Sequence, residues 1–574
     1  MKLFFNFIYI TLFLGIISCS NTEQADLIIH NAKIYTVNDL FDIAEAMVIT
    51  DGKIVAIGPE HEIRNKYNAT KTIDAKKQTI YPGFIDAHCH FVGYALNLKK
   101  VNLVGTTSFD DVIKRVIDFS KNNSDEWIIG RGWDQNDWDI KEFPTKEKLD
   151  SLFPTRPVFL TRIDGHAAIA NAEALRRANI TSITKVEGGI ITFNIKKNGE
   201  TITIDHNINV SETSFQNKYQ PEPTGILLDN ALGLIHKVIP QPTILDIEVA
   251  LLNAQHNLFA VGITTVDDAG LSKDTINLID QLQQDGKLKM KVYAMISGNE
   301  NMLNYYLEKG PYKTEMLTVN SFKFYADGAL GSRGACLLQP YSDIIENEHY
   351  GLLINEADFF NKYAPLLYEK GFQMNTHCIG DSANRLILDV YAKVLKGVND
   401  KRWRIEHAQV IHSNDFEKFR DYTIIPSVQS THATSDMYWA KDRLGKERVK
   451  TAYAYKDLLN QNGIIALGTD FPVEDISPIK TFYAAIARKD SKGYPENGYQ
   501  MENALTREEA LKGMTIWAAI ANFEENEKGS LEVGKSADFV LLNNDIMTTS
   551  EENILKVKVV QTFINGENVF TIKK

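Results

Sequence analysis

The chain has 574 residues, of which 44% are hydrophobic and 24% are charged, and these proportions exclude a disordered chain. This length allows a large buried core and exceeds one ordinary domain, although α/β barrels run long as single units. The formal net charge is -12 and Lys and Arg form no clustered run, so we expect no nucleic-acid partner.

A short apolar segment opens the chain, running from Leu3 to Ile17 behind Lys2. It is shorter than the about 20 residues that a membrane-spanning helix needs, and it is typical of a signal peptide. The following Ser18-Cys19 resembles a bacterial lipobox, which implies cleavage before Cys19 and lipid attachment to its sulfur. A plain signal peptide with an incidental cysteine, or an uncleaved anchor, is the alternative. We expect a lipoprotein signal peptide at 1–18 and a membrane anchor at Cys19, in the periplasmic or outer-membrane part of a bacterial cell envelope.

Both ends of the remaining chain predict β-structure. Residues 26–38 and 46–58 alternate apolar and polar side chains around Asp51-Gly52, a preferred hairpin turn. Residues 537–542 and 557–572 repeat this character around Asn565-Gly566. We therefore expect one small β-sandwich, built from residues 19–77 and 526–574.

The middle of the chain, residues 78–525, predicts a (β/α)8 TIM barrel, because eight short apolar runs alternate with mostly helical patterns. These runs are 81–90, 262–268, 291–297, 321–328, 372–381, 403–409, 424–429 and 464–471. The gap between the first and second runs is too long for one crossover. We expect a large insertion at about 95–243, placed as a lid or substrate domain over the catalytic face.

Several of these runs end in side chains that can bind a metal. His88 and His90 are two residues apart, so on a strand they project to the same face and form half of a metal site. The other candidates follow later strands in the order Lys323, His377, His407 and Asp470. Each one alone has an ordinary explanation, such as a helix cap, a turn or a bond to the backbone. Their joint occurrence at the catalytic ends of barrel strands favours a metal site.

The motifs together resemble the amidohydrolase superfamily of metal-dependent hydrolases, and the amidohydrolase 3 group in particular. They are PGFIDAHCH at 82–90, RGWD at 131–134, DGH at 164–166, DGALGSR at 327–333, TDFP at 469–472 and GKSAD at 534–538. The resemblance covers nearly all of the chain that follows the predicted signal peptide. It is specific for the family and says little about the substrate.

The resemblance implies roles for the candidate ligands. His88 and His90 match ligands of a first metal, and His377 and His407 match ligands of a second. Lys323 matches a lysine that CO2 carboxylates in members with two metals, although a single metal with unmodified Lys323 stays open. Asp470 matches a ligand that also serves as general base. We expect one or two divalent ions; zinc suits these donors, and iron, manganese and nickel remain alternatives.

Weaker candidates lie in the insertion and in one loop. His166 is a candidate catalytic residue that polarises the substrate, with a turn-stabilising histidine as the alternative. Arg333 and Trp133 are candidate substrate-binding residues, with a surface salt bridge and the core of the insertion as their respective alternatives. Cys89 points away from His88 and His90, so we expect a small buried hydrophobe there.

The predicted activity is hydrolysis of a non-peptide C–N bond in an amide, an N-substituted formamide or a cyclic amide, by attack of metal-bound hydroxide. A deaminase with the same fold is the alternative, which Lys323 disfavours, because deaminases of the superfamily usually lack this lysine. A non-catalytic binding or regulatory lipoprotein is a second alternative, and the full set of ligands disfavours it. We expect a small-molecule substrate, and a homodimer is left open.

Overall fold

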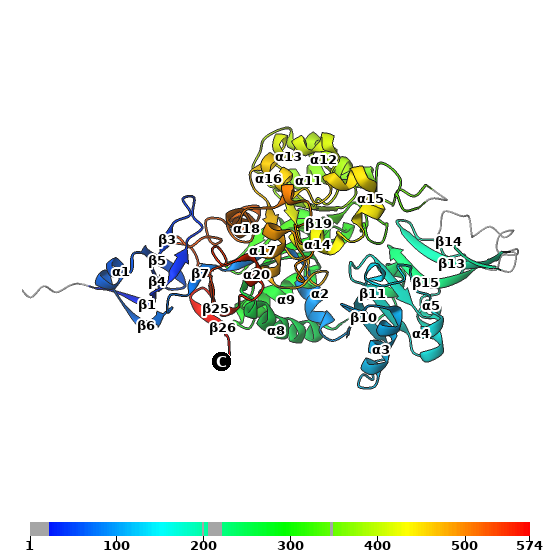
Figure 1. Ribbon diagram of the computed structural model, residues 1–574, viewed down its shortest axis with the longest axis horizontal. Helices are drawn as coiled ribbons and strands as arrows, with labels where there is room; N and C mark the ends of the chain where they lie inside the picture. Colours follow the sequence, from blue (N-terminus) through cyan, green and yellow to red (C-terminus); the bar gives the residue numbers. More distant parts are fainter. Residues whose placement is uncertain (1–21, 198–199, 205–220, 241, 345–347, 574) are drawn as a thin grey trace, which may run out of the picture.

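The computed structural model describes residues 22–197, 200–204, 221–240, 242–344 and 348–573. The predicted signal peptide at 1–18 and the predicted lipidation site Cys19 lie outside these residues. The molecule is elongated, with sheets from the chain ends on one side, a barrel in the middle and the insertion on the other side (Figure 1). Within the described ranges, no helix is both long enough and apolar enough to cross a membrane.

Eight parallel strands form the barrel, as predicted. In sheet order they are β23 (Ala466–Leu467), β22 (Ile425–Val428), β21 (Arg404–His407), β20 (Gln373–Cys378), β19 (Leu317–Tyr325), β17 (Lys291–Ser297), β16 (Ile263–Leu271) and β8 (Phe84–Cys89). A short strand, β18 (Tyr312–Lys313), pairs with β19 outside this order. The TIM-barrel prediction is confirmed, with one strand at each of the eight predicted runs.

Backbone hydrogen bonds between the ends of β8 and the segment after β23 bring the first and last strands together. The nitrogen of Asp470 donates to the carbonyl of His88 at 2.7 Å, and the nitrogen of His90 donates to the carbonyl of Phe471 at 2.8 Å. Gly468 permits this approach, because a Cβ atom there would lie 2.5 Å from the nitrogen of His88. Closure of the barrel therefore sets His88 and His90 directly beside Asp470.

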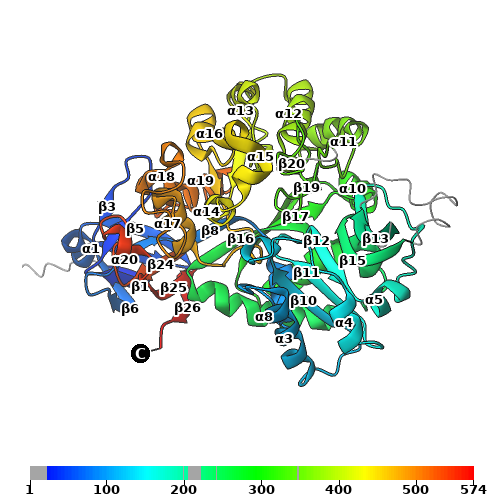
Figure 2. The same cartoon turned by 45° about the vertical axis from the view of Figure 1, so that its right-hand side comes forward.

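Helices surround the barrel on its outside, and those after β23 follow the last barrel strand (Figure 2). They are α8 (Ile244–Ala260), α9 (Lys273–Gln284), α10 (Glu300–Lys309), α11 (Ala357–Lys370), α12 (Asp381–Leu395), α13 (Phe416–Asp421), α14 (Ser430–Asp436), α15 (Ala440–Arg448), α16 (Tyr455–Asn462), α17 (Pro478–Ala487), α18 (Arg507–Gly513) and α19 (Ile516–Ala521). Local sequence starts several of them. In α8, for example, the side chains of Thr243 and Asp246 form a reciprocal capping box.

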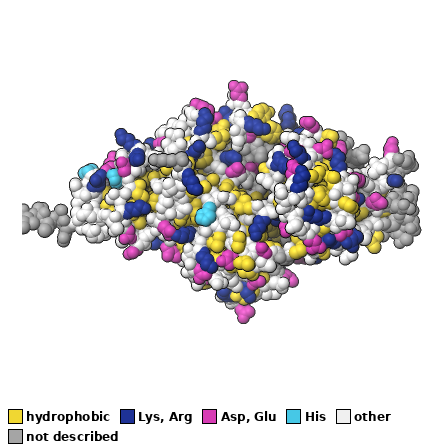
Figure 3. Space-filling view, turned by 90° about the horizontal axis from the view of Figure 1, so that it is seen from below, with side chains coloured by type: hydrophobic (Ala, Val, Ile, Leu, Met, Phe, Trp, Pro, Cys, Tyr) yellow, Lys and Arg dark blue, Asp and Glu magenta, His cyan; other side chains and the backbone are white. Residues whose placement is uncertain are grey.

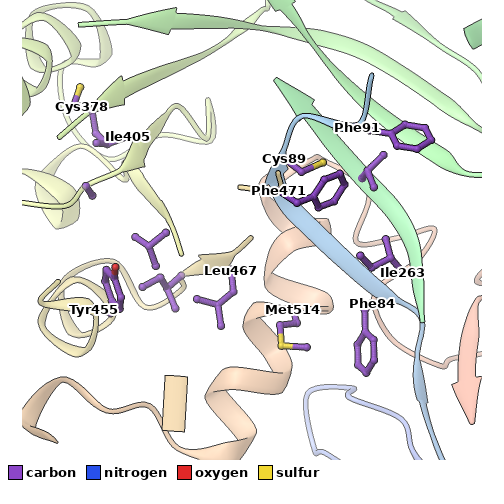
Figure 4. Close-up of a cluster of buried hydrophobic side chains, with 14 of the residues drawn as sticks. Phe84, Cys89, Phe91, Ile263, Cys378, Ile405, Tyr455, Leu467, Phe471 and Met514 are labelled. Carbon is purple, nitrogen blue, oxygen red and sulfur yellow. The ribbon is translucent and has the colours of Figure 1, made fainter. Parts of the chain in front are cut away.

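The barrel strands are buried on both faces, which is the usual environment of a parallel sheet covered by helices. All six residues of β8 are buried. Phe84, Cys89 and Ile263 pack with Leu467, Phe471 and Met514 in the cluster drawn in Figure 4. Cys89 therefore lies in the apolar core.

The insertion forms its own sheet between β8 and β16. In sheet order its strands are β14 (Glu200–Ile204), β13 (Gly189–Lys197), β15 (Glu222–Asp229), β12 (Ala167–Ala170), β11 (Val158–Arg162), β10 (Ile128–Trp133) and β9 (Val101–Asn102). The helices of this region are α2 (Phe91–Asn97), α3 (Phe109–Ser120), α4 (Glu147–Leu152), α5 (Ala172–Arg177) and α7 (Leu232–His236).

Two further sheets come from the chain ends and share one apolar core. The first has the order β5 (Lys53–Gly58), β4 (Ala46–Thr50), β1 (Glu23–His30), β6 (Tyr67–Asp74), and α1 (Glu60–Lys66) follows β5. The second has the order β26 (Glu567–Thr571), β25 (Val559–Ile564), β24 (Phe539–Leu542), β7 (Thr79–Pro82), β2 (Lys33–Tyr35), β3 (Ile43–Ala44), and α20 (Glu551–Ile554) lies between β24 and β25.

The N-terminal part of this sandwich extends beyond the expected boundary at residue 77. Strand β7 pairs with β24 and with β2, so it belongs to the second sheet and not to the barrel. The apolar sequence runs on from β7 into β8, and Gly83 separates the two strands. The change of sheet therefore has no signal in hydrophobicity.

Charged side chains of both signs are interspersed with apolar ones on the face shown in Figure 3. No large area of a single sign stands out on this face.

Candidate metal centre

The metal-competent residues predicted from the sequence converge at one end of the barrel. His88 belongs to β8 and His90 follows it; Lys323, His377 and His407 lie on β19, β20 and β21; Asp470 follows β23. All of them except the fully buried His88 line a cavity of about 770 Å³. The insertion forms part of its wall through Arg131, Asp164 and His166.

Asp470 lies at the centre of this group. Its Oδ1 is 3.2 Å from Nε2 of His90 and 3.7 Å from Nε2 of His88, and its Oδ2 is 4.0 Å from Nδ1 of His407. The Nζ atom of Lys323 lies 3.0 Å from Nε2 of His88. One carboxylate thus connects ligand candidates from the first, sixth and eighth strands.

His377 lies in the same cavity but farther from Asp470. Its ring centroid is 4.6 Å from that of His407, and its Nε2 atom is 3.9 Å from Oδ1 of Asp327. Asp327 accepts backbone hydrogen bonds from Ile379 and Gly380 at 3.0 and 2.8 Å. Asp327 therefore holds the loop that follows His377. The dipeptide Asp327-Gly328 alone would predict only an ordinary turn.

His432 is a further ligand candidate that the sequence reading missed. It lies on α14, just after β22, and its Nε2 atom is 3.7 Å from Oδ2 of Asp470. His407, His432 and Asp470 form one compact triad of possible ligands, and His88, His90 and Asp470 form another. Counting histidines just beyond each strand end would have identified His432.

Glu406 was also missed, although it precedes His407. Its Oε2 atom lies 2.5 Å from Nδ1 of His88, and both side chains are completely buried. A carboxylate on the far ring nitrogen of a histidine fixes the tautomer and leaves Nε2 for a metal. Side chains alternate along β21, so a strand pattern that selects His407 as a ligand assigns Glu406 to the opposite face.

Burial favours the neutral form of three histidines of this site, His88, His377 and His407. It lowers the pKa of His377 and of His407 well below the ordinary value, and neighbouring histidines and Lys323 add to this effect. Burial also lowers the pKa of His88. Metal ligation requires neutral imidazole, so these side chains are electrostatically prepared for it.

Lys323 and Asp470 are shifted in ways that suit the same site. Burial lowers the pKa of Lys323 to about 8. Burial alone would raise the pKa of Asp470, but His90, His407 and His88 outweigh it and hold this pKa well below its usual range. Asp470 is therefore an anion, and a substantial fraction of Lys323 is a neutral amine at mildly alkaline pH.

The donor set fits a divalent ion. The buried atoms of this site that lack a hydrogen-bond partner among the described residues include His377 Nε2, His432 Nε2 and Glu406 Oε1, and the closest printed contact of Asp470 Oδ1 is Nε2 of His90 at 3.2 Å. Unpartnered buried polar atoms are costly and uncommon, and a bound cation would satisfy them. Imidazole nitrogens and carboxylate oxygens are the donors that zinc takes in enzymes.

The backbone is strained at two of these positions. His407 has a φ of 73° and Asp470 has a φ of 60°, in the left-handed region that side chains with a Cβ rarely adopt. Such conformations cost energy and collect at functional sites.

His166 reaches the cavity from the insertion, and its ring centroid is 5.1 Å from that of His377. Its Nδ1 atom lies 2.8 Å from Oδ1 of the buried Asp229, a partner that the sequence reading did not identify. Burial lowers the pKa of His166, but Asp229 and Asp164 outweigh this and raise it above its ordinary value.

The two candidate substrate-binding residues lie elsewhere, and both predictions need correction. Trp133 is buried in the core of the insertion, where its indole nitrogen donates to the carbonyl of Leu160 at 2.8 Å. Arg333 pairs with Asp343 at 2.9 Å and does not line the cavity. Trp133 is a core residue of the insertion, because its ring packs into the apolar cluster there. Its neighbours Gly132 and Asp134 line the cavity.

The sequence model of the amidohydrolase family matches residues 71–207 and 215–570. The chain belongs to the amidohydrolase family. This confirms the family expected from the motifs and agrees with the strand-end ligands and the metal-dependent chemistry of that family.

Individual amidohydrolase relatives match nearly the whole chain. Protein LONG AFTER FAR-RED 3 from Arabidopsis thaliana is 30% identical, over 95% of this chain and 92% of its own. The N-substituted formamide deformylase of Arthrobacter pascens is 24% identical, over 95% of this chain and 98% of its own. The crystal structure of an uncharacterized metal-dependent hydrolase from Pyrococcus horikoshii OT3 superimposes with a TM-score of 0.71 at 27% identity, covering 92% of this chain and 99% of that one.

Proposed function

We propose that this protein is a metal-dependent hydrolase of a non-peptide C–N bond in an amide, an N-substituted formamide or a cyclic amide. The observation that carries the proposal is the convergence of buried, partly unpartnered imidazole and carboxylate atoms around Asp470 on the floor of the cavity. The similarity to an N-substituted formamide deformylase along the whole chain supports the reaction class.

The residues that would hold one or two divalent ions, with zinc as the best fit, are His88, His90, Lys323, His377, His407 and Asp470, with His432 as an addition. A bound divalent ion supplies an acidified water and polarises the substrate carbonyl. Lys323, if carboxylated by CO2, would add oxygen donors for these ions.

Asp470 is suited to move the proton. It is an anion, it faces the cavity, and its Oδ1 atom lies 3.2 Å from Nε2 of His90. It accepts the proton of the attacking water at a carboxylate oxygen. It then gives this proton to the leaving nitrogen, so the amine departs neutral.

His166 is suited to stabilise negative charge on the substrate. Asp229 occupies its Nδ1 atom and favours the protonated ring, which leaves Nε2–H as a donor. This donor acts on the carbonyl oxygen as charge develops there.

The test is a hydrolysis screen of N-formyl and N-acyl amines and cyclic amides with the metal-loaded protein and its Asp470→Asn variant. The proposal expects amine release by wild type and a loss of about 100-fold or more in kcat for the variant. Asp475→Asn is the matched control, because Asp475 lines the same cavity and pairs with Lys480. Undiminished activity of Asp470→Asn would rule out its role, and ammonia release from aminated rings alone would favour a deaminase.

We also propose that the protein is a lipoprotein of a bacterial cell envelope, anchored at Cys19. The apolar segment Leu3 to Ile17 and the adjoining Ser18-Cys19 support this location.

A further inference from the structure

Two basic side chains, Lys100 and Arg131, lie in the part of the cavity wall that the insertion forms. Arg131 belongs to β10, and Lys100 directly precedes β9. Strands β9 and β10 pair in parallel, with Val101 opposite Gly130. The two side chains therefore come from neighbouring positions of one sheet.

Neither side chain has an acidic partner in the part of the chain that the structure describes. Arg131 donates through Nη2 to the carbonyl of Ile163 at 2.9 Å, and its Nε atom is buried without a hydrogen-bond partner. The ammonium group of Lys100 forms no hydrogen bond or ion pair with the described residues, and burial, followed by the charge of Arg131, lowers its pKa to about 8. Two neighbouring cations on one cavity wall repel each other unless an anion joins them.

Of the other basic side chains of this cavity wall, Lys323 belongs to the candidate metal centre, and Arg162 and Lys480 are paired with acids. Arg162 contacts Asp134 at 2.5 Å and Asp164 at 2.6 Å, and Lys480 contacts Asp475 at 2.7 Å. The carboxylates that act electrostatically on Arg131 are Asp470 and Asp164. Asp164 is already bound to Arg162, and Asp470 belongs to the candidate metal centre.

Arg131 also lies close to the proposed reaction centre. A Cβ atom at Gly165 would be 3.2 Å from Nη2 of Arg131, and the next residue is His166. Gly165 has a φ of 79°, so the loop needs glycine there and leaves room for the guanidinium group. An anion bound by Arg131 would sit beside the loop that carries the proposed carbonyl-polarising histidine.

We infer that Lys100 and Arg131 bind a carboxylate group of the substrate, so that the hydrolysed amide is an anionic one. This inference rests on the proposed function and adds the substrate class to it. A guanidinium group presents its donors in a planar fork that matches a carboxylate, and Lys100 adds a second positive charge.

The test measures binding by titration calorimetry with three probes on the metal-loaded protein. N-acetyl-leucine carries its carboxylate on the amine side, N-(3-methylbutyl)succinamic acid carries it on the acyl side, and N-(3-methylbutyl)acetamide is the neutral analogue. Wild type should prefer one of the acids over the neutral amide by about 10- to 100-fold. The preferred acid identifies the side of the amide that bears the carboxylate.

Arg131→Gln and Lys100→Gln should each weaken binding of the preferred acid by about 10-fold or more and leave the neutral amide within about 3-fold. Lys99→Gln is the matched control, because Lys99 is exposed and pairs with Asp246 outside the cavity. Retained binding of the neutral amide shows that each variant keeps its cavity.

Equal affinity of wild type for the acids and the neutral amide would overturn the inference, as would equal losses for all three probes in the variants. Absence of binding by every probe would overturn it as well. Preferential binding of an acid together with no amine release from any amide of the hydrolysis screen would contradict the proposed function. The carboxylate site at Lys100 and Arg131 would still stand, so the two failures are distinguishable.

Discussion

The Nδ1 atom of His88 lies 2.5 Å from Oε2 of Glu406, and neither side chain is exposed to solvent. Burial alone would raise the pKa of Glu406, but His88 and Arg404 outweigh it and lower this pKa. The carboxylate is therefore an anion that orients the ring of His88.

Glu406→Gln should weaken divalent metal binding by about 10- to 100-fold, because the amide no longer fixes the tautomer of His88. Competition with a chromophoric chelator measures this affinity. Glu417→Gln, at an exposed position on α13, is the control. Unchanged affinity in Glu406→Gln would show that Glu406 has no positioning role.

The His166 and Asp229 pair should affect catalysis more than metal binding. His166→Ala should lower kcat by about 100-fold, as expected for loss of one donor to a developing oxyanion, while the metal content stays constant. Asp229→Asn should lower the pKa of His166, because it removes the interaction that raises it. The limb of the pH–rate profile on which activity declines with rising pH should then move to lower pH, and an unmoved limb would contradict the role of Asp229.

Lys323 should react with CO2 more extensively as pH rises through about 8, because its neutral amine is the reactive form and burial lowers its pKa to about 8. Carbon-13 NMR with labelled bicarbonate detects the carbamate. The signal should grow between about pH 7 and 9 and be absent in Lys323→Met. A signal that persists in Lys323→Met would come from another amine.

Cys19 should carry the lipid if the chain is exported as proposed. Growth with a labelled fatty acid should label wild type, and Cys19→Ala should be unlabelled and leave the membrane fraction. Cys336→Ala is the control, since Cys336 is a partly exposed free cysteine of the folded part. Equal labelling of Cys19→Ala would disprove the anchor.

The barrel was predictable because its strands are apolar runs followed by polar residues, and all eight runs became strands of one sheet. The ligand candidates were predictable to the extent that they end those strands. His432 was missed because it lies on a helix, and Asp229 because its partnership with His166 spans 63 residues. The His166–Asp229 pair depends on the pairing of β12 with β15 inside the insertion, and periodicity does not encode that pairing.

Side-chain direction was the least predictable property. Strand alternation separates Glu406 from His407, yet both side chains serve the same centre because the backbone at His407 has a φ of 73°. Trp133 and Arg131 are also neighbours on one strand, and the structure reverses their expected importance: the tryptophan packs inside and the arginine lines the cavity.

Metal analysis of the purified protein by inductively coupled plasma mass spectrometry, beside His88→Ala and His377→Ala variants, tests the metal centre most directly. The account predicts one or two tightly bound divalent transition-metal ions per chain in wild type and a clear loss in both variants, with folding checked by circular dichroism. Active wild-type protein without bound transition metal, or variants that keep the full metal content, would contradict it.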